Sequence, residues 1–197
     1  MIHRPRVLLL GGSHACPSHT RSLLFECASM LEDLGADTRC WDVAEHDLTP
    51  VGRGCEDDDP VAASLRQAAR WADAFVIATP LYHNSYSGAV KNVLDHLDVR
   101  HVRGKPAGLI SCSGGIPSPQ AVDHLRLVVR ALRGIAIPCQ VLAADAEFER
   151  VDERFELTSP AARARLEQLA SELLWFAERL SPRALGETAT EEAALAV

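Results

Sequence analysis

The chain has 197 residues, of which 47% are apolar and 24% are charged, and these values are typical of a soluble globular protein. The net charge of −7 argues against a nucleic-acid partner, because phosphate neutralisation requires clustered Lys and Arg. No apolar run is long enough to span a bilayer, and the run at residues 7–10 is too short for a secretory signal. We therefore expect a cytoplasmic protein with no membrane partner.

The alternation of strand-like and helix-like apolar spacing is the main signal for the fold. Buried strands are predicted at residues 6–12, 37–43, 73–80, 105–113 and 135–143. Helices are predicted at residues 20–34, 61–71, 86–98, 120–133 and 160–180. An acidic loop with Gly and Pro is predicted at residues 51–60, and Ser159 followed by Pro160 is typical of a helix start.

This order of elements predicts an α/β protein with a parallel sheet covered by helices on both faces, a three-layer sandwich. We expect one domain at residues 1–180 and a loosely held tail at residues 181–197. Ligands of such sheets bind outside the carboxyl ends of the strands. The candidate site is therefore formed by the loops after Gly12, Thr79 and Ser111.

Six cysteines stand far apart in the sequence and form no pattern typical of a zinc site or a disulfide framework. They are Cys16, Cys27, Cys40, Cys55, Cys112 and Cys139. We expect scattered buried thiols and no metal site.

The first loop carries residues that suit a phosphate group. The residues between strand and helix include Ser13, Ser18, His19 and Thr20. Free backbone N–H groups and the helix dipole favour an anion there, and Arg21 adds positive charge. Helix capping by the same hydroxyls is the alternative explanation. The glycine motifs of nucleoside-triphosphate and dinucleotide loops are absent.

Cys16 and Arg21 also permit a catalytic interpretation. The stretch CPSHTRS resembles the loop of small tyrosine phosphatases, in which a cysteine and an arginine enclose the substrate phosphate. The pair is one residue closer here than in that family, and Pro17 removes an N–H donor. A hydrolase that uses Cys16 is therefore the weaker alternative.

The second loop carries the most specific motif. The stretch ATPLYHNSYSGAVKNVLDHL, residues 78–97, resembles the pattern T-P-x-Y-x-x-S-x-x-G-x-L-K-N-x-x-D of NADPH-dependent FMN reductases. The matching residues are Thr79, Pro80, Tyr82, Ser85, Gly88, Lys91, Asn92 and Asp95. The first loop and the stretch SCSGG at residues 111–115 also resemble this family, and the resemblance covers about residues 5–145.

The resemblance implies a flavodoxin-like sheet with strand order 2-1-3-4-5 that binds FMN. It implies that the phosphate of FMN lies on Ser13, Ser18, His19, Thr20 and Arg21. It implies that the ribityl chain and ring lie along Pro80, Leu81, Tyr82, His83, Asn84 and Ser85. The third loop would contribute Ser111, Ser113, Gly114 and Gly115.

The implied activity is hydride transfer from NADPH or NADH to FMN and then to a flavin, quinone, azo or nitro acceptor. His83 is the best candidate for proton transfer, because an imidazole titrates near neutral pH. A flavodoxin-like electron carrier without NAD(P)H activity is the principal alternative. The family also implies a homodimer or homotetramer, with the helix at residues 86–98 as a contact and with Lys91, Asn92 and Asp95 as scaffold.

Two residues depart from the family pattern. Ala15 stands where the first loop usually has arginine, and Leu81 stands where many members have glutamate. His124 lies near the place where some flavin reductases insert a tyrosine, and this chain has no such insertion. The missing insertion favours FMN held as a prosthetic group rather than released as a product.

Overall fold

The structure is a computed structural model that describes residues 4–53, 59–181 and 183. Cys55, part of the predicted loop at residues 51–60, and most of the predicted tail lie outside the described residues. Of that tail, Ser181 is buried, and the Arg183 guanidinium pairs with the buried carboxylate of Asp73. The described start of the segment is therefore packed against the body of the protein.

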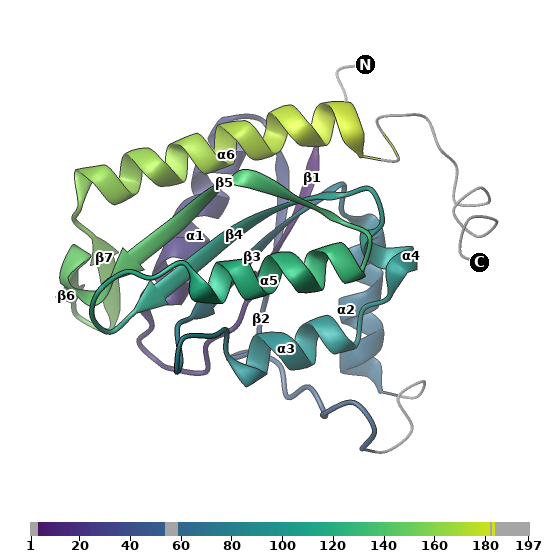
Figure 1. The fold of residues 1–197 in the computed structure, drawn as a ribbon, viewed down its shortest axis with the longest axis horizontal. Coiled ribbons are helices and arrows are strands. Elements are labelled where there is room, and N and C mark those ends of the chain that lie inside the picture. The colour runs from purple at the N-terminus through teal and green to yellow at the C-terminus, as the bar shows by residue number, and fades with distance from the viewer. Residues whose placement is uncertain (1–3, 54–58, 182, 184–197) are drawn as a thin grey trace.

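Seven strands and six α-helices occur in the described residues (Figure 1). The strands are β1 (Arg6–Gly11), β2 (Asp37–Asp42), β3 (Ala74–Pro80), β4 (Pro106–Ser113), β5 (Ile135–Ala144), β6 (Phe148–Val151) and β7 (Arg154–Leu157). The helices are α1 (His19–Asp33), α2 (Pro60–Trp71), α3 (Gly88–Asp95), α4 (Val99–Val102), α5 (Gln120–Ala131) and α6 (Pro160–Leu180).

The central sheet has five parallel strands in the order β2-β1-β3-β4-β5, which confirms the predicted flavodoxin-like topology. Its inner strands are mainly apolar, because both faces of the sheet are covered, and the buried polar residues Thr79, Ser111 and Ser113 lie near their carboxyl ends. All of β3 and β4 is buried, and the side chains of Val7 to Leu10 in β1 are fully inaccessible. The carboxyl ends of β1, β3 and β4 lie side by side, and so do the three candidate loops.

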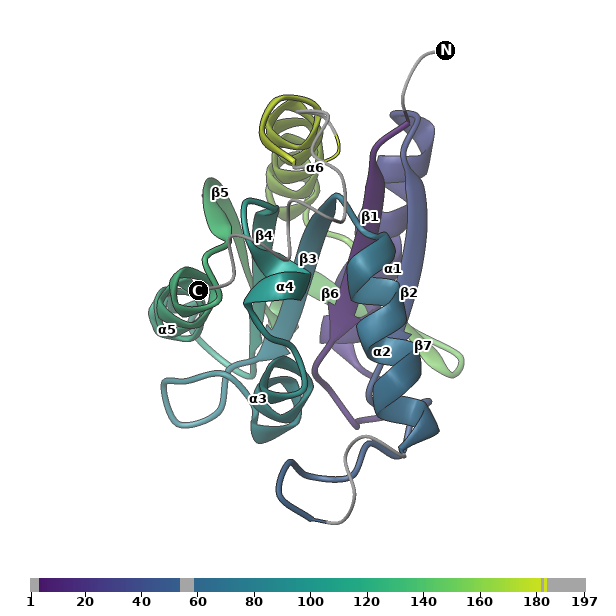
Figure 2. The ribbon, with the colours of Figure 1, turned by 90° about the vertical axis from the view of Figure 1, so that its right-hand side faces the viewer.

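Two apolar clusters cover the two faces of the sheet. Helices α1 and α6 pack on one face through Leu23, Leu31 and Leu169, and helices α2, α3 and α5 pack on the other through Leu65, Val93 and Leu125. Figure 2 shows the same arrangement from the side, with α3 and α5 as neighbours. This confirms the three predicted layers. No helix in the described part of the chain is long and apolar enough to cross a membrane.

The predicted helix at residues 86–98 is divided in the structure. Helix α3 begins after Ser87, whose Oγ accepts a hydrogen bond from Val90 N at 3.1 Å. A second short helix, α4, begins after Asp98, whose carboxylate accepts from Arg100 N at 2.8 Å. The other predicted strands and helices agree with the structure to within two residues at each end.

The antiparallel hairpin of β6 and β7 was not predicted. It follows a 3₁₀ turn at Asp145–Glu147 and lies beyond the carboxyl end of β5 (Figure 1). Phe148 and Leu157 are buried in the cluster beneath α1 and α6. The hairpin therefore closes the core at the end of the sheet where the candidate loops lie.

Candidate functional site

The first loop brings two buried hydroxyls together at the start of α1. Ser18 Oγ donates to Ser13 Oγ at 2.9 Å, and Ala15 N donates to the same Ser13 oxygen at 3.3 Å. Ser18 is also the N-cap of α1, because its Oγ accepts from Arg21 N at 3.3 Å. The capping role that the sequence left open is thus real, and it coexists with a convergent set of donors.

This arrangement suits an anion. The first N–H groups of a helix have no carbonyl partner within the helix, and they carry the positive end of its dipole. The buried hydroxyls of Ser13, Ser18 and Thr20 lie beside these groups. A phosphate at this position would receive hydrogen bonds from several neutral donors.

The side chains of His19 and Arg21 lie on carboxylates of other segments. Arg21 Nε lies 3.0 Å from Asp42 Oδ2 at the end of β2, and the same guanidinium also contacts Glu45. His19 Nδ1 lies 2.9 Å from Asp145 Oδ1. The contribution of these two residues to phosphate binding stays a prediction, and in this structure their side chains link the loop to its surroundings.

The second loop forms a tight turn at the end of β3. Tyr82 and Ser85 exchange two backbone hydrogen bonds of 2.9 Å, and the two residues between them, His83 and Asn84, have φ values of 49° and 62°. Asn tolerates this left-handed conformation better than most residues. Leu81 N donates to Cys112 O at 2.6 Å and so ties the turn to β4.

The side chains of this turn face outward. Tyr82 is 54% exposed, and His83 and Asn84 are also exposed. Ser85 Oγ lies 3.0 Å from His124 Nδ1 of α5, so that helix α5 supports the end of the turn. The turn at Pro80 to Ser85 therefore lies beside the end of β4 and the start of α5, with Tyr82 and His83 accessible from solvent.

The third loop is open and low in side-chain bulk. Ser111 and Ser113 are buried at the end of β4, and Ser113 Oγ hydrogen-bonds the carbonyl oxygens of Gly115 and Ile116, each at 3.2 Å. Gly114 and Gly115 are exposed, and no atom lies within 4 Å of a Cβ placed on Gly115. The backbone here is free to approach a flat ligand closely.

Ser118 is a candidate that the sequence analysis missed. Its Oγ is buried and makes no hydrogen bond within the described part of the chain. A buried polar atom without a partner has a free-energy cost, which a ligand can remove. The only sequence signal was its position in the loop after the double glycine.

The buried cysteines Cys112 and Cys27 are poor nucleophiles, because burial keeps their thiols protonated. Burial raises the pKa of Cys112 to about 12, with a hydrogen bond from Thr20 acting in the opposite direction. Burial also raises the pKa of Cys27 to about 12. Cys16 and Cys40 are exposed, so the prediction of buried thiols holds for Cys27, Cys112 and Cys139 but not for these two. Among residues 4–53, 59–181 and 183, no cluster of His, Cys, Asp or Glu could hold a metal ion.

The residues present fit FMN at three places. The first loop offers hydroxyl and amide donors for a dianionic phosphate, the second offers an exposed turn, and the third offers two bare glycines and the unpaired Ser118 hydroxyl. A doubly wound parallel sheet with these loops at its switch point defines a flavodoxin-like flavoprotein.

The chain belongs to a family within this class. Residues 5–149 match the family described as NADPH-dependent FMN reductase. The chain is also 39% identical over 151 residues to the FMN-dependent NADPH-azoreductase of Staphylococcus saprophyticus. The matched region covers 74% of this chain and 80% of that protein. The enzyme of the same name from Staphylococcus aureus is 34% identical over the same lengths.

Solved structures share the fold. The flavoenzyme NAD(P)H:(acceptor) oxidoreductase FerB from Paracoccus denitrificans has a TM-score of 0.73 at 19% identity, over 90% of this chain and 99% of that one. The apo form of the NADH:FMN oxidoreductase EMOB has a TM-score of 0.71 at 22% identity, over 90% of both chains. A flavodoxin from Streptococcus pneumonia TIGR4 has a TM-score of 0.55 at 17% identity, over 88% of this chain and 99% of that one.

The family confirms the predicted class of enzyme, an FMN oxidoreductase that uses NADPH. It argues against the electron carrier and the hydrolase that the sequence had left as alternatives. The individual cofactor contacts stay predictions.

Proposed function

We propose that this protein binds FMN across the three loops and reduces a small acceptor, with NADPH as the electron donor. The observation that carries the proposal is the convergence of the Ser13 and Ser18 hydroxyls at the start of α1, beside two exposed loops. The proposed contacts are Ser13, Ser18, His19, Thr20, Arg21, Pro80, Leu81, Tyr82, His83, Asn84, Ser85, Ser111, Ser113, Gly114 and Gly115. Residues 1–180 would form one FMN-binding domain.

Each loop would have a separate task. The hydroxyls of Ser13 and Ser18 would bind the phosphate, together with the N–H groups of the first turn of α1. In the second loop the N–H groups of Tyr82 and Ser85 each donate to the carbonyl oxygen of the other residue, so the amides of His83 and Asn84 would face the ribityl chain and the ring edge. Gly114 and Gly115 would let the backbone approach the ring.

Bound FMN supplies the hydride chemistry, and the protein supplies position and access. Tyr82 and the 88% exposed Ile116 border the open side of the site, where a nicotinamide and then an acceptor would bind in turn. His83 would supply a proton to a reduced acceptor. Because its side chain is exposed on a tight turn, it can reach solvent for a new proton.

The relatives named FMN-dependent NADPH-azoreductases support an azo acceptor and NADPH as the donor. Flavins, quinones and nitro compounds are also reduced by a hydride or by a pair of electrons, and we include them as acceptors. NADH would serve as a weaker donor. A cytoplasmic location is supported by the five described cysteines, which are all free thiols.

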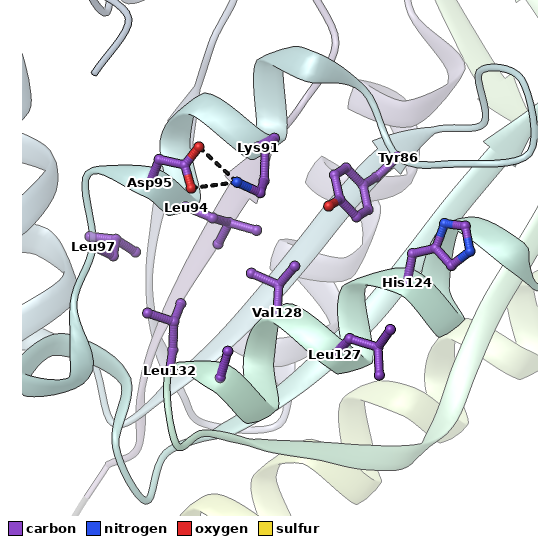
Figure 3. Close-up of a pocket in the computed structure, with 10 residues that line it drawn as sticks. Tyr86, Lys91, Leu94, Asp95, Leu97, His124, Leu127, Val128 and Leu132 are labelled. Carbon is purple, nitrogen blue, oxygen red and sulfur yellow. Dashed lines mark hydrogen bonds and ion pairs between the residues drawn. The ribbon is translucent and has the colours of Figure 1, made fainter. Parts of the chain in front are cut away.

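We also propose that two copies associate through the groove between α3 and α5. The groove has a volume of about 480 Å³, and Figure 3 shows Tyr86 and His124 at one end and Leu97 and Leu132 toward the other. Its wall includes Leu127, which is 55% exposed, and its rim carries the Lys91–Asp95 ion pair. A homodimer built on this face could pair again into a homotetramer.

Assays of NADPH oxidation on protein reconstituted with FMN test the proposed function. The acceptor panel should contain an azo dye, a quinone, a nitroaromatic compound and free FMN. We expect acceptor-dependent oxidation of NADPH that requires FMN and is slower with NADH. Ser13→Ala and Ser18→Ala should each raise the FMN concentration needed for half-maximal rate. No NADPH oxidation with any acceptor would contradict the proposal.

A further inference from the structure

His19 is held by three side chains that come from the segment after β5. Its Nδ1 lies 2.9 Å from Asp145 Oδ1, and its ring packs against Phe155 and Phe148 with centroid distances of 3.7 and 4.8 Å. The His19 side chain is only 20% exposed. We name this group of four residues, His19, Asp145, Phe148 and Phe155, the His19 clamp.

The same aspartate also borders the third loop. A Cβ placed on Gly114 would lie 3.5 Å from Asp145 Oδ2, so the carboxylate lies close to the backbone of that loop. Asp145 thus contacts the first turn of α1 through His19 and lies close to the loop that follows β4. In the proposed function, these two segments hold opposite ends of FMN.

The turn that carries Asp145 is itself fixed. Glu147 Oε2 accepts from Ala144 N at 2.9 Å, and the Glu147 carbonyl oxygen accepts from Thr158 N at 2.9 Å. Phe148 is buried, and Phe155 packs against the same core. The hairpin therefore offers α1 a rigid contact surface and not a mobile flap.

We propose that the His19 clamp is a positioning device that sets the phosphate loop relative to the third loop and so keeps FMN bound between turnovers. This inference rests on the proposed function and deepens it. The imidazole of His19 then stays on Asp145 and acts on the phosphate indirectly, through the placement of the α1 start, while the backbone N–H of His19 is its proposed contact with the phosphate. The hairpin, which the sequence did not predict, becomes part of the cofactor site.

Titrations of apoprotein with FMN and with riboflavin test the clamp, because riboflavin lacks the phosphate. The test variants are Asp145→Asn and Phe155→Leu. We expect each to raise the dissociation constant for FMN three- to tenfold and that for riboflavin less than twofold. The modest size follows from the partial exposure of the ion pair, with Asp145 47% exposed. Fluorescence quenching of either flavin gives the constants.

Glu156→Gln is the matched control. Glu156 lies on the same hairpin, and its carboxylate pairs with Arg154 on the surface at 2.7 Å, so the variant removes the same charge without touching His19. It should bind both flavins as the wild type does. Thermal unfolding of each variant checks that the fold is intact, and Phe155→Leu serves if Asp145→Asn does not fold.

Three results would overturn the clamp. Unchanged FMN affinity in folded variants would remove its role, and an equal loss of FMN and riboflavin would show a general structural effect. Tighter FMN binding by Asp145→Asn would show that the carboxylate mainly repels the phosphate. Failure of the wild type to bind FMN would instead contradict the proposed function, so the two failures are distinct.

The double variant His19→Asn with Asp145→Asn tests whether the two residues act together. Its dissociation constant for FMN should be no higher than that of the single variant that binds FMN more weakly.

Discussion

Ser87 Oγ donates a hydrogen bond of 2.6 Å to the carbonyl oxygen of Gly12, and this bond joins the start of α3 to the first loop. Ser87 Oγ also accepts a hydrogen bond from Val90 N, and Ser87 N donates to Thr79 Oγ1 at 2.9 Å. One buried serine therefore fixes the ends of β1 and β3 and the start of α3. The first and second loops keep their relative position because of it.

Ser87→Ala should lower the free energy of unfolding by about 1–3 kcal/mol, because a helix cap and a buried carbonyl each lose a partner. It should also weaken FMN binding, since two loops are released together. Urea unfolding and FMN titration measure the two effects. Ser64→Ala is the control, as Ser64 Oγ donates to Val61 O on an exposed helix surface. Equal stability of the two variants would contradict the role of Ser87.

Gly12→Ala should be strongly destabilising, while Gly115→Ala should not. A Cβ on Gly12 would lie 2.6 Å from Val90 Cβ and 3.0 Å from Ala78 O, both in the packed interior. Overpacking of this kind costs about 1–3 kcal/mol of stability. A Cβ on Gly115 meets nothing within 4 Å, so that variant should unfold at the wild-type urea concentration. Similar losses in both variants would disagree with the packing described for Gly12.

The buried His101 should make the protein less stable at acidic pH. Burial lowers the pKa of His101, and its Nε2 lies 3.1 Å from Arg70 Nη1, where only a neutral nitrogen can accept. The unfolded chain, with a histidine pKa of about 6.5, then binds a proton that the folded chain rejects. Stability is therefore lost as pH falls below that value, by up to about 1.4 kcal/mol per pH unit.

Urea unfolding of the wild type and of the His101→Gln variant, measured between pH 7.5 and pH 5, tests whether His101 causes this loss of stability. The variant removes the titrating group, so its stability should fall less steeply with pH than that of the wild type. Parallel pH profiles for the two proteins would show that another group causes the loss.

Leu127→Asp should convert the proposed dimer into a monomer. A charge placed on the wall of the groove cannot be buried without a partner, so association would carry a desolvation cost. Leu34→Asp is the control, because Leu34 is 52% exposed at the end of α1, on the opposite face of the sheet. Sedimentation analysis distinguishes the states. A wild type that is already a monomer, or a Leu127→Asp variant that still dimerises, would exclude the groove as the interface.

The sequence was sufficient for the sheet and for bringing the three candidate loops to one edge of it. The runs at Val7 to Leu10 and in β3 are fully buried, and uninterrupted apolar runs of that length have few other solutions in an α/β chain. The hairpin escaped prediction because β6 and β7 have four residues each and are mostly exposed, so each strand carries only two apolar residues, which is too short a pattern to indicate a strand.

The direction of single side chains was beyond the sequence. His19 and Arg21 lie in a loop whose sequence resembles a phosphate-binding loop. No neighbouring residue in the sequence indicates that their side chains pair with Asp145 and Asp42, which belong to distant segments. The same holds for the contact between Ser85 and His124, which depends on how α5 packs beside α3. Tertiary packing determines these contacts, and the spacing of residues in the sequence does not predict them.

Anaerobic addition of NADPH to the FMN-loaded protein tests the central claim most directly. The account predicts that FMN stays with the protein through gel filtration, and that its visible absorbance is lost on addition of one equivalent of NADPH, without a helper enzyme. Ser13→Ala with Ser18→Ala should retain less FMN under the same conditions. A protein that retains no FMN, or whose bound FMN keeps its colour in excess NADPH, would contradict the account.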